Sequence, residues 1–136
     1  MALLTRKRVI LIEAESSYGT DPTPAATDVV LVTDLTITPK SSDVVNRDVV
    51  RPYLGSSEQL LANTRVECTF SVELAGSGTA GTAPRYSSAL KAAGLAETVV
   101  SSTSVTYTPV SSSFSSVTIH YNIDGVRHKM TGCRGN

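Results

Sequence analysis

Hydrophobic and polar side chains alternate most regularly in residues 65–74, which predicts a β-strand with one apolar and one polar face. Such a strand places its apolar face against a core and its polar face against water or another polar surface. The apolar positions are Val66, Cys68, Phe70, Val72 and Leu74, and the polar positions are Arg65, Glu67, Thr69, Ser71 and Glu73.

Three other segments have the patterns of strands. Residues 9–14 form a short apolar run that is typical of a strand buried on both faces. Residues 29–38 alternate and are expected to end at Pro39, because proline cannot donate a hydrogen bond to a neighbouring strand. Residues 104–110 form a further strand. Between the first two strands, residues 15–28 contain two prolines and a glycine and are expected to be a loop.

The end of the chain predicts a β-hairpin. The dipeptide Asp124-Gly125 supplies the two residues of positive φ that a type I′ turn requires. Folding about this turn sorts apolar pairs onto one face and polar pairs onto the other, which supports the register. The expected pairs are Ile123–Val126, Tyr121–His128 and Ile119–Met130 on the apolar face, and Asn122–Arg127, His120–Lys129 and Thr118–Thr131 on the polar face. His120 is therefore expected on the outer face of the hairpin and His128 on its inner face.

One segment favours a short helix. Tyr86, Ala89, Leu90 and Ala93 follow the i, i+3, i+4, i+7 spacing of a helix with one apolar face. We expect Thr82 to be the N-cap, Pro84 to lie near the first turn and Gly94 to occupy the left-handed position after the last turn.

Residues 40–64 show no sustained period and contain Pro52 and Gly55, so the sequence predicts a long loop inserted in the domain. The segment is too apolar for a solvated linker. Its apolar side chains need a partner, either the core of this domain or another subunit, and the second alternative is favoured. These side chains are Val44, Val45, Val49, Val50, Tyr53, Leu54, Leu60 and Leu61.

Composition narrows the class of protein. A chain of 136 residues suits one domain, residues 1–136, and excludes a large enzyme with its own cofactor domain. Twelve Lys and Arg balance twelve Asp and Glu, which argues against a general binder of nucleic acid or anionic membranes. The apolar runs are far shorter than the roughly 20 residues of a membrane span. Ser and Thr form about a quarter of the chain. The expected fold is mainly β, with about six strands and one short α-helix.

No constellation of residues points to catalysis or to a cofactor. Residues 76–81 match the spacing G-x-G-x-x-G, but the preceding strand is amphipathic and no βαβ pattern surrounds them, so we interpret them as a turn. Two cysteines and two histidines are too few and too scattered for a metal site. Glu67 and Glu73 lie about 20 Å apart along one strand, too far for paired acid–base catalysis. We therefore expect no enzyme activity, no cofactor and no bound metal.

Several segments together resemble the tail tube proteins of long-tailed, siphovirus-type bacteriophages. The opening LTRKRVILIEAESSYGTDPTP (residues 4–24) is similar to the start of these proteins. Further similar pieces are GSGTAGTAPRYSSALKAAGLAET (76–98), VTYTPVSS (105–112) and VTIHYNIDGVRHKMTGCRG (117–135). The resemblance covers most of the chain in order, and residues 40–64 match least well. Family members continue in strands beyond Gly135, which implies that this chain is shortened at its C-terminus.

The resemblance implies a fold and a role. The expected fold is an antiparallel β-sandwich or barrel of the tail tube type, with one flanking helix. The resemblance also implies that the protein is a virion protein. Copies of it are expected to assemble as six-fold rings, which stack into a hollow tube for DNA ejection. The tube meets terminator, tape measure and distal tail proteins. DNA passes through it without specific binding, and the subunit does not insert into membranes. The subunit is expected in the host cytoplasm before it joins the phage tail.

The surfaces of such a tube are assigned here as hypotheses. The candidates for contacts between stacked rings are Leu3, Leu4, Arg6, Asp48, Arg51, Tyr53 and Leu54. A lumen that lets DNA slide should present acidic and neutral side chains, and the candidates are Glu67, Thr69, Ser71 and Glu73. The polar face of residues 118–122 is the alternative lining. Alternative functions are a tail terminator, distal tail or baseplate ring protein of the same fold, or a monomeric β-sandwich binding module.

Overall fold

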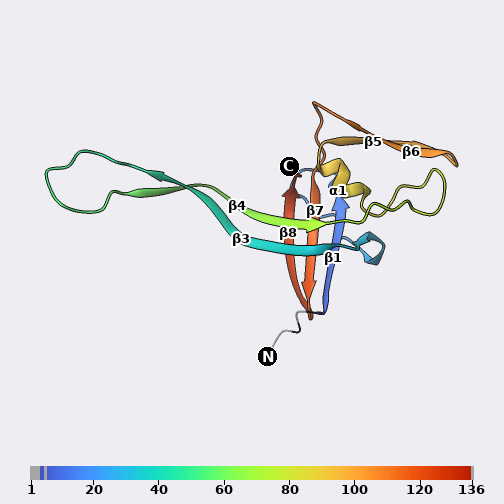
Figure 1. The fold of residues 1–136 in the computed structure, drawn as a ribbon, viewed down its shortest axis with the longest axis horizontal. Helices are drawn as coiled ribbons and strands as arrows, with labels where there is room; N and C mark the ends of the chain where they lie inside the picture. Colours follow the sequence, from blue (N-terminus) through green and yellow to red (C-terminus); the bar gives the residue numbers. More distant parts are fainter. Residues whose placement is uncertain (1–3, 5, 136) are drawn as a thin grey trace. The chain divides into compact units, whose positions relative to one another are not determined.

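In the part of the chain that the structure describes, the strands pair in three antiparallel sheets (Figure 1). The computed structural model describes residue 4 and residues 6–135. Strands account for 48% of the structure and helices for 7%, so the predicted mainly β fold with one short α-helix is confirmed. The chain divides into two compact units, residues 33–71 and the remainder.

The larger unit is built on a four-stranded sheet in the order β2-β1-β7-β8. The strands are β1 (Arg8–Ala14), β2 (Val29–Val30), β7 (Val117–Ile123) and β8 (Val126–Cys133). Ile12 pairs with Ile119 and Ile10 with Tyr121, and all four side chains are buried. Residues 117–121 of β7 are buried without interruption. Since successive side chains of a strand point to opposite faces, both faces of this central strand are covered.

The helix is held against a second, smaller sheet. The helix α1 (Ser87–Ala92) contacts β1, β7 and β5 (Leu95–Val100), and β5 pairs with β6 (Ser104–Pro109). Glu97 of β5 accepts hydrogen bonds from the hydroxyl groups of Ser87 and Tyr107, the second at 2.8 Å. Burial opposes ionisation of Glu97, but these hydrogen bonds and Lys91 outweigh it and lower the pKa of its carboxyl. The carboxylate of Glu97, in β5, is thus hydrogen-bonded to both α1 and β6.

The helix begins later than the sequence predicted. Its N-cap residue is Tyr86, so the assignment of Thr82 was wrong. The intervening Pro84 supplies the carbonyl oxygen that accepts the first turn's hydrogen bond, from the N–H of Ser87. Gly94 has a φ of +85°, which confirms its left-handed position after the helix.

The C-terminal hairpin has the predicted turn, with φ angles of +43° at Asp124 and +88° at Gly125. Five of the six predicted pairs are confirmed, from Ile123–Val126 to Ile119–Met130. The pair Thr118–Thr131 was wrong, because the register shifts and Val117 lies opposite Cys133. Gly132 lies in this bulge with a φ of +67°, a conformation that glycine adopts without strain.

The exposure of the two histidines is the reverse of the prediction. His120 was expected on an outer face and is 2% exposed, whereas His128 is exposed. The predicted pairing of His128 with Tyr121 is present, and the two rings stack with their centroids 6.0 Å apart. The polar face of the hairpin is covered by residues 15–28, which contribute Asp21 beside His120. His128 lies on β8, the edge strand of its sheet, and its side chain is exposed.

The smaller unit is one long hairpin of β3 (Thr33–Asn46) and β4 (Gln59–Ser71). The predicted loop over residues 40–64 was wrong at both ends, because strand structure occupies residues 40–46 and 59–64. Pro39 does not end β3, since it lies in a register shift between the pairs Thr38–Glu67 and Ser41–Arg65. A bulge frees proline from donating a ladder hydrogen bond. Only residues 47–58 connect the two strands.

We predict that Gly132→Ala lowers the free energy of unfolding by about 1–2 kcal/mol, because alanine is strained at positive φ. Its Cβ would also lie 3.1 Å from Cζ of the Tyr18 ring. Urea unfolding followed by circular dichroism measures the change.

Gly76→Ala is the matched control, because its added Cβ meets no atom within 4 Å. Its expected effect is about 0.5 kcal/mol or less. Equal midpoints for the two variants would show that the bulge does not depend on glycine.

Candidate assembly surfaces

The connection at the end of the β3–β4 hairpin, residues 47–58, is here called the tip. Val50 is 101% exposed and Leu54 is 104% exposed, so the neighbouring residues of the hairpin cover neither side chain. The guanidinium carbon of Arg51 lies 6.0 Å from the centre of the Tyr53 ring, and Tyr53 is 65% exposed. Uncovered apolar side chains at a protruding loop mark a surface for a protein partner.

The strands next to the tip are apolar on both faces. Val44 pairs with Leu61 and Val45 with Leu60, and all four side chains are exposed. Because consecutive residues of a strand point to opposite faces, each face of the ribbon carries one apolar pair. A two-stranded ribbon has no third layer in which to bury them. Both faces of this part of the hairpin therefore carry exposed apolar side chains.

The other half of the hairpin has a polar face. Thr36 lies opposite Thr69 and Thr38 opposite Glu67, so these side chains share one face. The Nε of Arg65 donates to Glu67 at 2.8 Å, and the same guanidinium contacts Asp43 at 3.4 Å. Hydrogen bonds from Ser41 and Arg65 lower the pKa of the Glu67 carboxyl. The strand face predicted to be polar therefore carries an exposed, ionised cluster.

The candidates for ring contacts fall into both units. Asp48, Arg51, Tyr53 and Leu54 all lie in the tip. Leu4 and Arg6 belong to the larger unit and are exposed, and the backbone N–H of Leu4 donates to Asp124 at 3.2 Å. Leu3 lies outside the described residues.

The candidates for a lumen surface are all exposed. Glu67, Thr69 and Ser71 point to one face of β4, while Glu73 follows the end of that strand. The alternative lining, residues 118–122, is not an open surface of this chain, because Thr118 and His120 are buried beneath residues 15–28.

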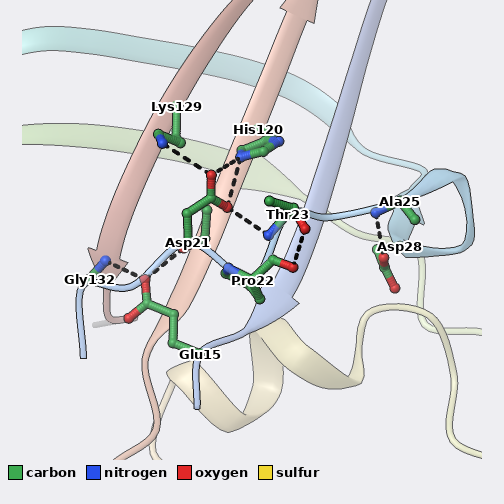
Figure 2. A network of polar contacts seen from close by, with 10 residues as sticks. Glu15, Asp21, Pro22, Thr23, Ala25, Asp28, His120, Lys129 and Gly132 are labelled. Atoms are coloured by element: carbon green, nitrogen blue, oxygen red, sulfur yellow. Dashed lines mark hydrogen bonds and ion pairs between the residues drawn. The ribbon is translucent and has the colours of Figure 1, made fainter. Parts of the chain in front are cut away.

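Residues 15–28, here called the cover segment, are held on the sheet by polar contacts (Figure 2). Glu15 follows β1 and accepts four hydrogen bonds. The donors are the Ser116 hydroxyl at 2.6 Å, the Thr118 hydroxyl and the Gly132 N–H at 2.7 Å, and the Gly19 N–H at 2.8 Å. Burial opposes ionisation of Glu15, but these bonds outweigh it and lower its pKa to about 2. The bulge removes the backbone N–H of Gly132 from the β-ladder, and this N–H donates its hydrogen bond to Glu15 instead.

Asp21 is the second anchor of the cover segment. Its carboxylate lies 3.1 Å from Nε2 of His120 and 3.1 Å from Nζ of Lys129, and it accepts the N–H of Thr23 at 2.9 Å (Figure 2). The Thr23 hydrogen bond, with Lys129 and His120, lowers the pKa of the Asp21 carboxyl. No side chain of residues 16–27 is fully buried, so polar contacts rather than apolar packing hold this segment.

Neither anchor could be predicted from the sequence. Residues 15–28 have the composition of a loop, and Asp21 is 99 residues from His120. Glu15 is 117 residues from Gly132. A short-range pattern contains no information on such contacts.

The chain matches the phage tail tube protein family over residues 5–136, nearly its whole length. The chain belongs to the phage tail tube protein family. The predicted resemblance is thereby confirmed. No match was found among curated proteins or among solved structures. The family is one of structural proteins of the virion tail, which places this tail tube protein in that class.

Within residue 4 and residues 6–135, no helix is long and apolar enough to cross a membrane. Over the same part of the tail tube protein, no three or more His, Cys, Asp or Glu side chains are grouped so that they could hold a metal ion.

We predict that Glu15→Gln lowers the free energy of unfolding at neutral pH by about 2 kcal/mol. The carboxylate of Glu15 accepts hydrogen bonds from four donors, whereas the amide of Gln would place its own N–H₂ group against some of those donors. Because the folded-state pKa lies below the ordinary 4.5, the stabilisation by Glu15 is complete above pH 4.5 and is lost as pH falls through about 2. The difference between the two proteins should shrink over that range in chemical unfolding experiments.

Glu73→Gln serves as the control, since Glu73 is exposed and lies outside the strands. It should leave the unfolding midpoint unchanged. A gap between wild type and Glu15→Gln that stays constant down to pH 2 would contradict the role assigned to the ionised carboxylate.

Proposed function

We propose that the chain is the major tail tube subunit of a siphovirus-type phage. In this proposal it forms stacked, hexameric rings around a hollow conduit through which DNA is ejected. Its membership of the tail tube family supports the general role. The observation that carries the assembly is the hairpin of β3 and β4, which leaves apolar side chains uncovered at its tip and on both of its faces.

The length of the β3–β4 hairpin supports a contact between copies of the subunit. At about 3.3 Å per residue, the 14 residues of β3 extend roughly 45 Å, long enough to reach beyond one small subunit. A segment covered from two sides can lie between two other subunits. We assign Asp48, Arg51, Tyr53 and Leu54 to the contact between stacked rings, together with Leu4, Arg6 and the preceding Leu3.

The edges of the four-stranded sheet support closure of each ring. At one edge, β8 has no neighbour beyond it among the described residues. At the other, β2 pairs with β1 only at Ile10 and Leu11, and leaves most of that strand's outer edge open. Open edges pair readily with strands of other chains. Pairing between the two different edges is a head-to-tail contact, which generates a closed ring when the rotation is right.

The polar face of β4 is our proposal for the lumen. Glu67, Thr69 and Ser71, with Glu73 beyond the strand, offer negative and neutral groups that do not hold phosphate. Arg65 does not conflict with this surface, because Asp43 and Glu67 already pair with its guanidinium. We expect terminator, tape measure and distal tail proteins as further partners, and the host cytoplasm as the place of the subunit before assembly.

We predict that replacing Tyr53 and Leu54 by serine abolishes polymerisation and leaves the subunit folded, because both side chains are exposed in the isolated chain. Negative-stain microscopy measures tube length, and thermal unfolding measures the fold. Leu31→Ser is the matched control, since Leu31 is 88% exposed and lies outside the hairpin. Tubes of unchanged length from the double variant would defeat the assignment of the tip.

The same microscopy separates the tube subunit from its alternatives. A tube subunit forms stacked rings or tubes, a terminator forms single rings, and a binding module stays monomeric. A compact, inert monomer at high concentration would overturn the proposed function.

A further inference from the structure

The edge of the four-stranded sheet that β8 forms is basic. Arg127, His128 and Lys129 follow one another along this strand, and all three are exposed. The sequence from residue 125 to residue 136 contains no Asp or Glu. Lys129 pairs with Asp21 at 3.1 Å, whereas no carboxylate of the described residues pairs with Arg127. Arg127 is thus an exposed cation at the sheet edge that has no acidic partner in the described chain.

The opposite edge of the same sheet is acidic. Glu13 lies in β1 beyond Ile10 and Leu11, the two residues that pair with β2, and Asp28 directly precedes β2. Burial raises the pKa of the Glu13 carboxyl, and the nearby carboxylates of Asp28 and Asp21 raise it further. In the described part of the chain, neither Glu13 nor Asp28 forms an ion pair with a basic side chain. Negative charge at this edge is therefore left without a counter-charge.

Glu13 and Arg127 point to the same face of the sheet. Glu13 lies opposite Thr118 and Arg127 lies opposite Asn122, and both of these partners belong to β7. Thr118 and Asn122 are an even number of residues apart, so their side chains share one face of that strand. Copies that join edge to edge around a closed ring all present the same face inward. The two charges would then lie on one side of each joint.

We propose that attraction between these oppositely charged edges selects the contact between neighbouring copies within a ring, with Arg127 of one copy facing Glu13 and Asp28 of the next. The inference rests on the proposed function, because it specifies how the two different sheet edges of that proposal recognise each other. Complementary charges speed encounter and exclude wrong partners more than they add affinity. Two basic edges repel, as do two acidic edges. The charges therefore favour the head-to-tail contact over a two-fold pairing of identical edges.

The same charges discriminate between alignments of the two edges. Arg8, at the start of β1, is a basic residue on the otherwise acidic edge. Arg85 also reaches this side of the sheet, but its guanidinium donates to the carbonyl oxygen of Thr27 at 2.8 Å. An alignment that places Arg127 beside Arg8 brings like charges together, whereas a shift along the strand toward Glu13 brings opposite charges together. Closing a sheet into a barrel requires a stagger of this kind.

Charge reversal tests the contact, with tube formation followed by negative-stain microscopy and sedimentation. Arg127→Glu removes the unpaired cation from the basic edge, and Glu13→Lys gives the acidic edge a basic group. Each variant alone should need at least about tenfold more protein than wild type to form tubes, because like charges then meet at every contact. The difference from wild type should shrink at about 1 M salt, where the Debye length is about 3 Å.

An equimolar mixture of the two variants is the decisive sample. In a ring where the variants alternate, the new lysine of one copy faces the new glutamate of its neighbour, and Glu13 and Arg127 meet at the next contact. Such a ring closes only with an even number of copies, as in the proposed hexamer. The mixture should form tubes at nearly the concentration that wild type requires. If wild type forms tubes and the mixture assembles no better than its components, the inference is overturned and the proposed function stands. If wild type itself forms no tubes, the proposed function fails.

Lys40→Glu is the matched control, because it reverses the charge of an exposed side chain that lies outside both edges and outside the tip. It should form tubes as wild type does, and thermal unfolding checks the fold of every variant. If Glu13→Lys unfolds, Arg127→Gln and Arg127→Glu still test the inference, since the Arg127 side chain is exposed. Reversal should impair assembly more than neutralisation does, and equal assembly by these two variants would count against the charged contact.

Discussion

The structure depends on one constraint: a two-stranded ribbon cannot bury its own apolar side chains. In the hairpin of β3 and β4, Val44 and Leu61 form a pair on one face, and Val45 and Leu60 form a pair on the other. Hydrophobic burial needs a second layer, and within residues 33–71 none exists. The distal half of the hairpin and its tip therefore offer binding surface to another chain, which is the physical basis of the proposed assembly.

The larger unit satisfies the same requirement internally. Its central strand β7 is buried on both faces, with Ile119 among apolar neighbours and Thr118 held by Glu15. The buried polar groups are paired, as low-dielectric surroundings require. Glu15 does this for two hydroxyl groups and two backbone N–H groups at once. The contrast between a self-contained unit and an uncovered hairpin fits the proposed assembly from subunits that are already folded.

Patterns over a few neighbouring residues predicted the turn and the strand pairing of the C-terminal hairpin. The dipeptide Asp124-Gly125 placed the hairpin turn and its first five pairs, because turn geometry and alternation depend on neighbouring residues. The long hairpin was missed because Pro39 and the tip interrupt its alternation, and a bulge compensates for the proline. The burial of His120 was missed for a different reason. Its cover comes from Asp21, 99 residues away.

The sequence by itself determined the mainly β class, the family, the short helix before Gly94 and the alternating strand around Phe70. Each follows from spacing within a few residues, or from the order of similar segments along the chain. Only the tertiary structure decided which polar face is covered, that Glu15 and Asp21 anchor the cover segment, and that the apolar mid-chain residues form an exposed ribbon. The reason is that burial and ion pairing depend on distance in space, whereas propensity and alternation depend on distance along the chain.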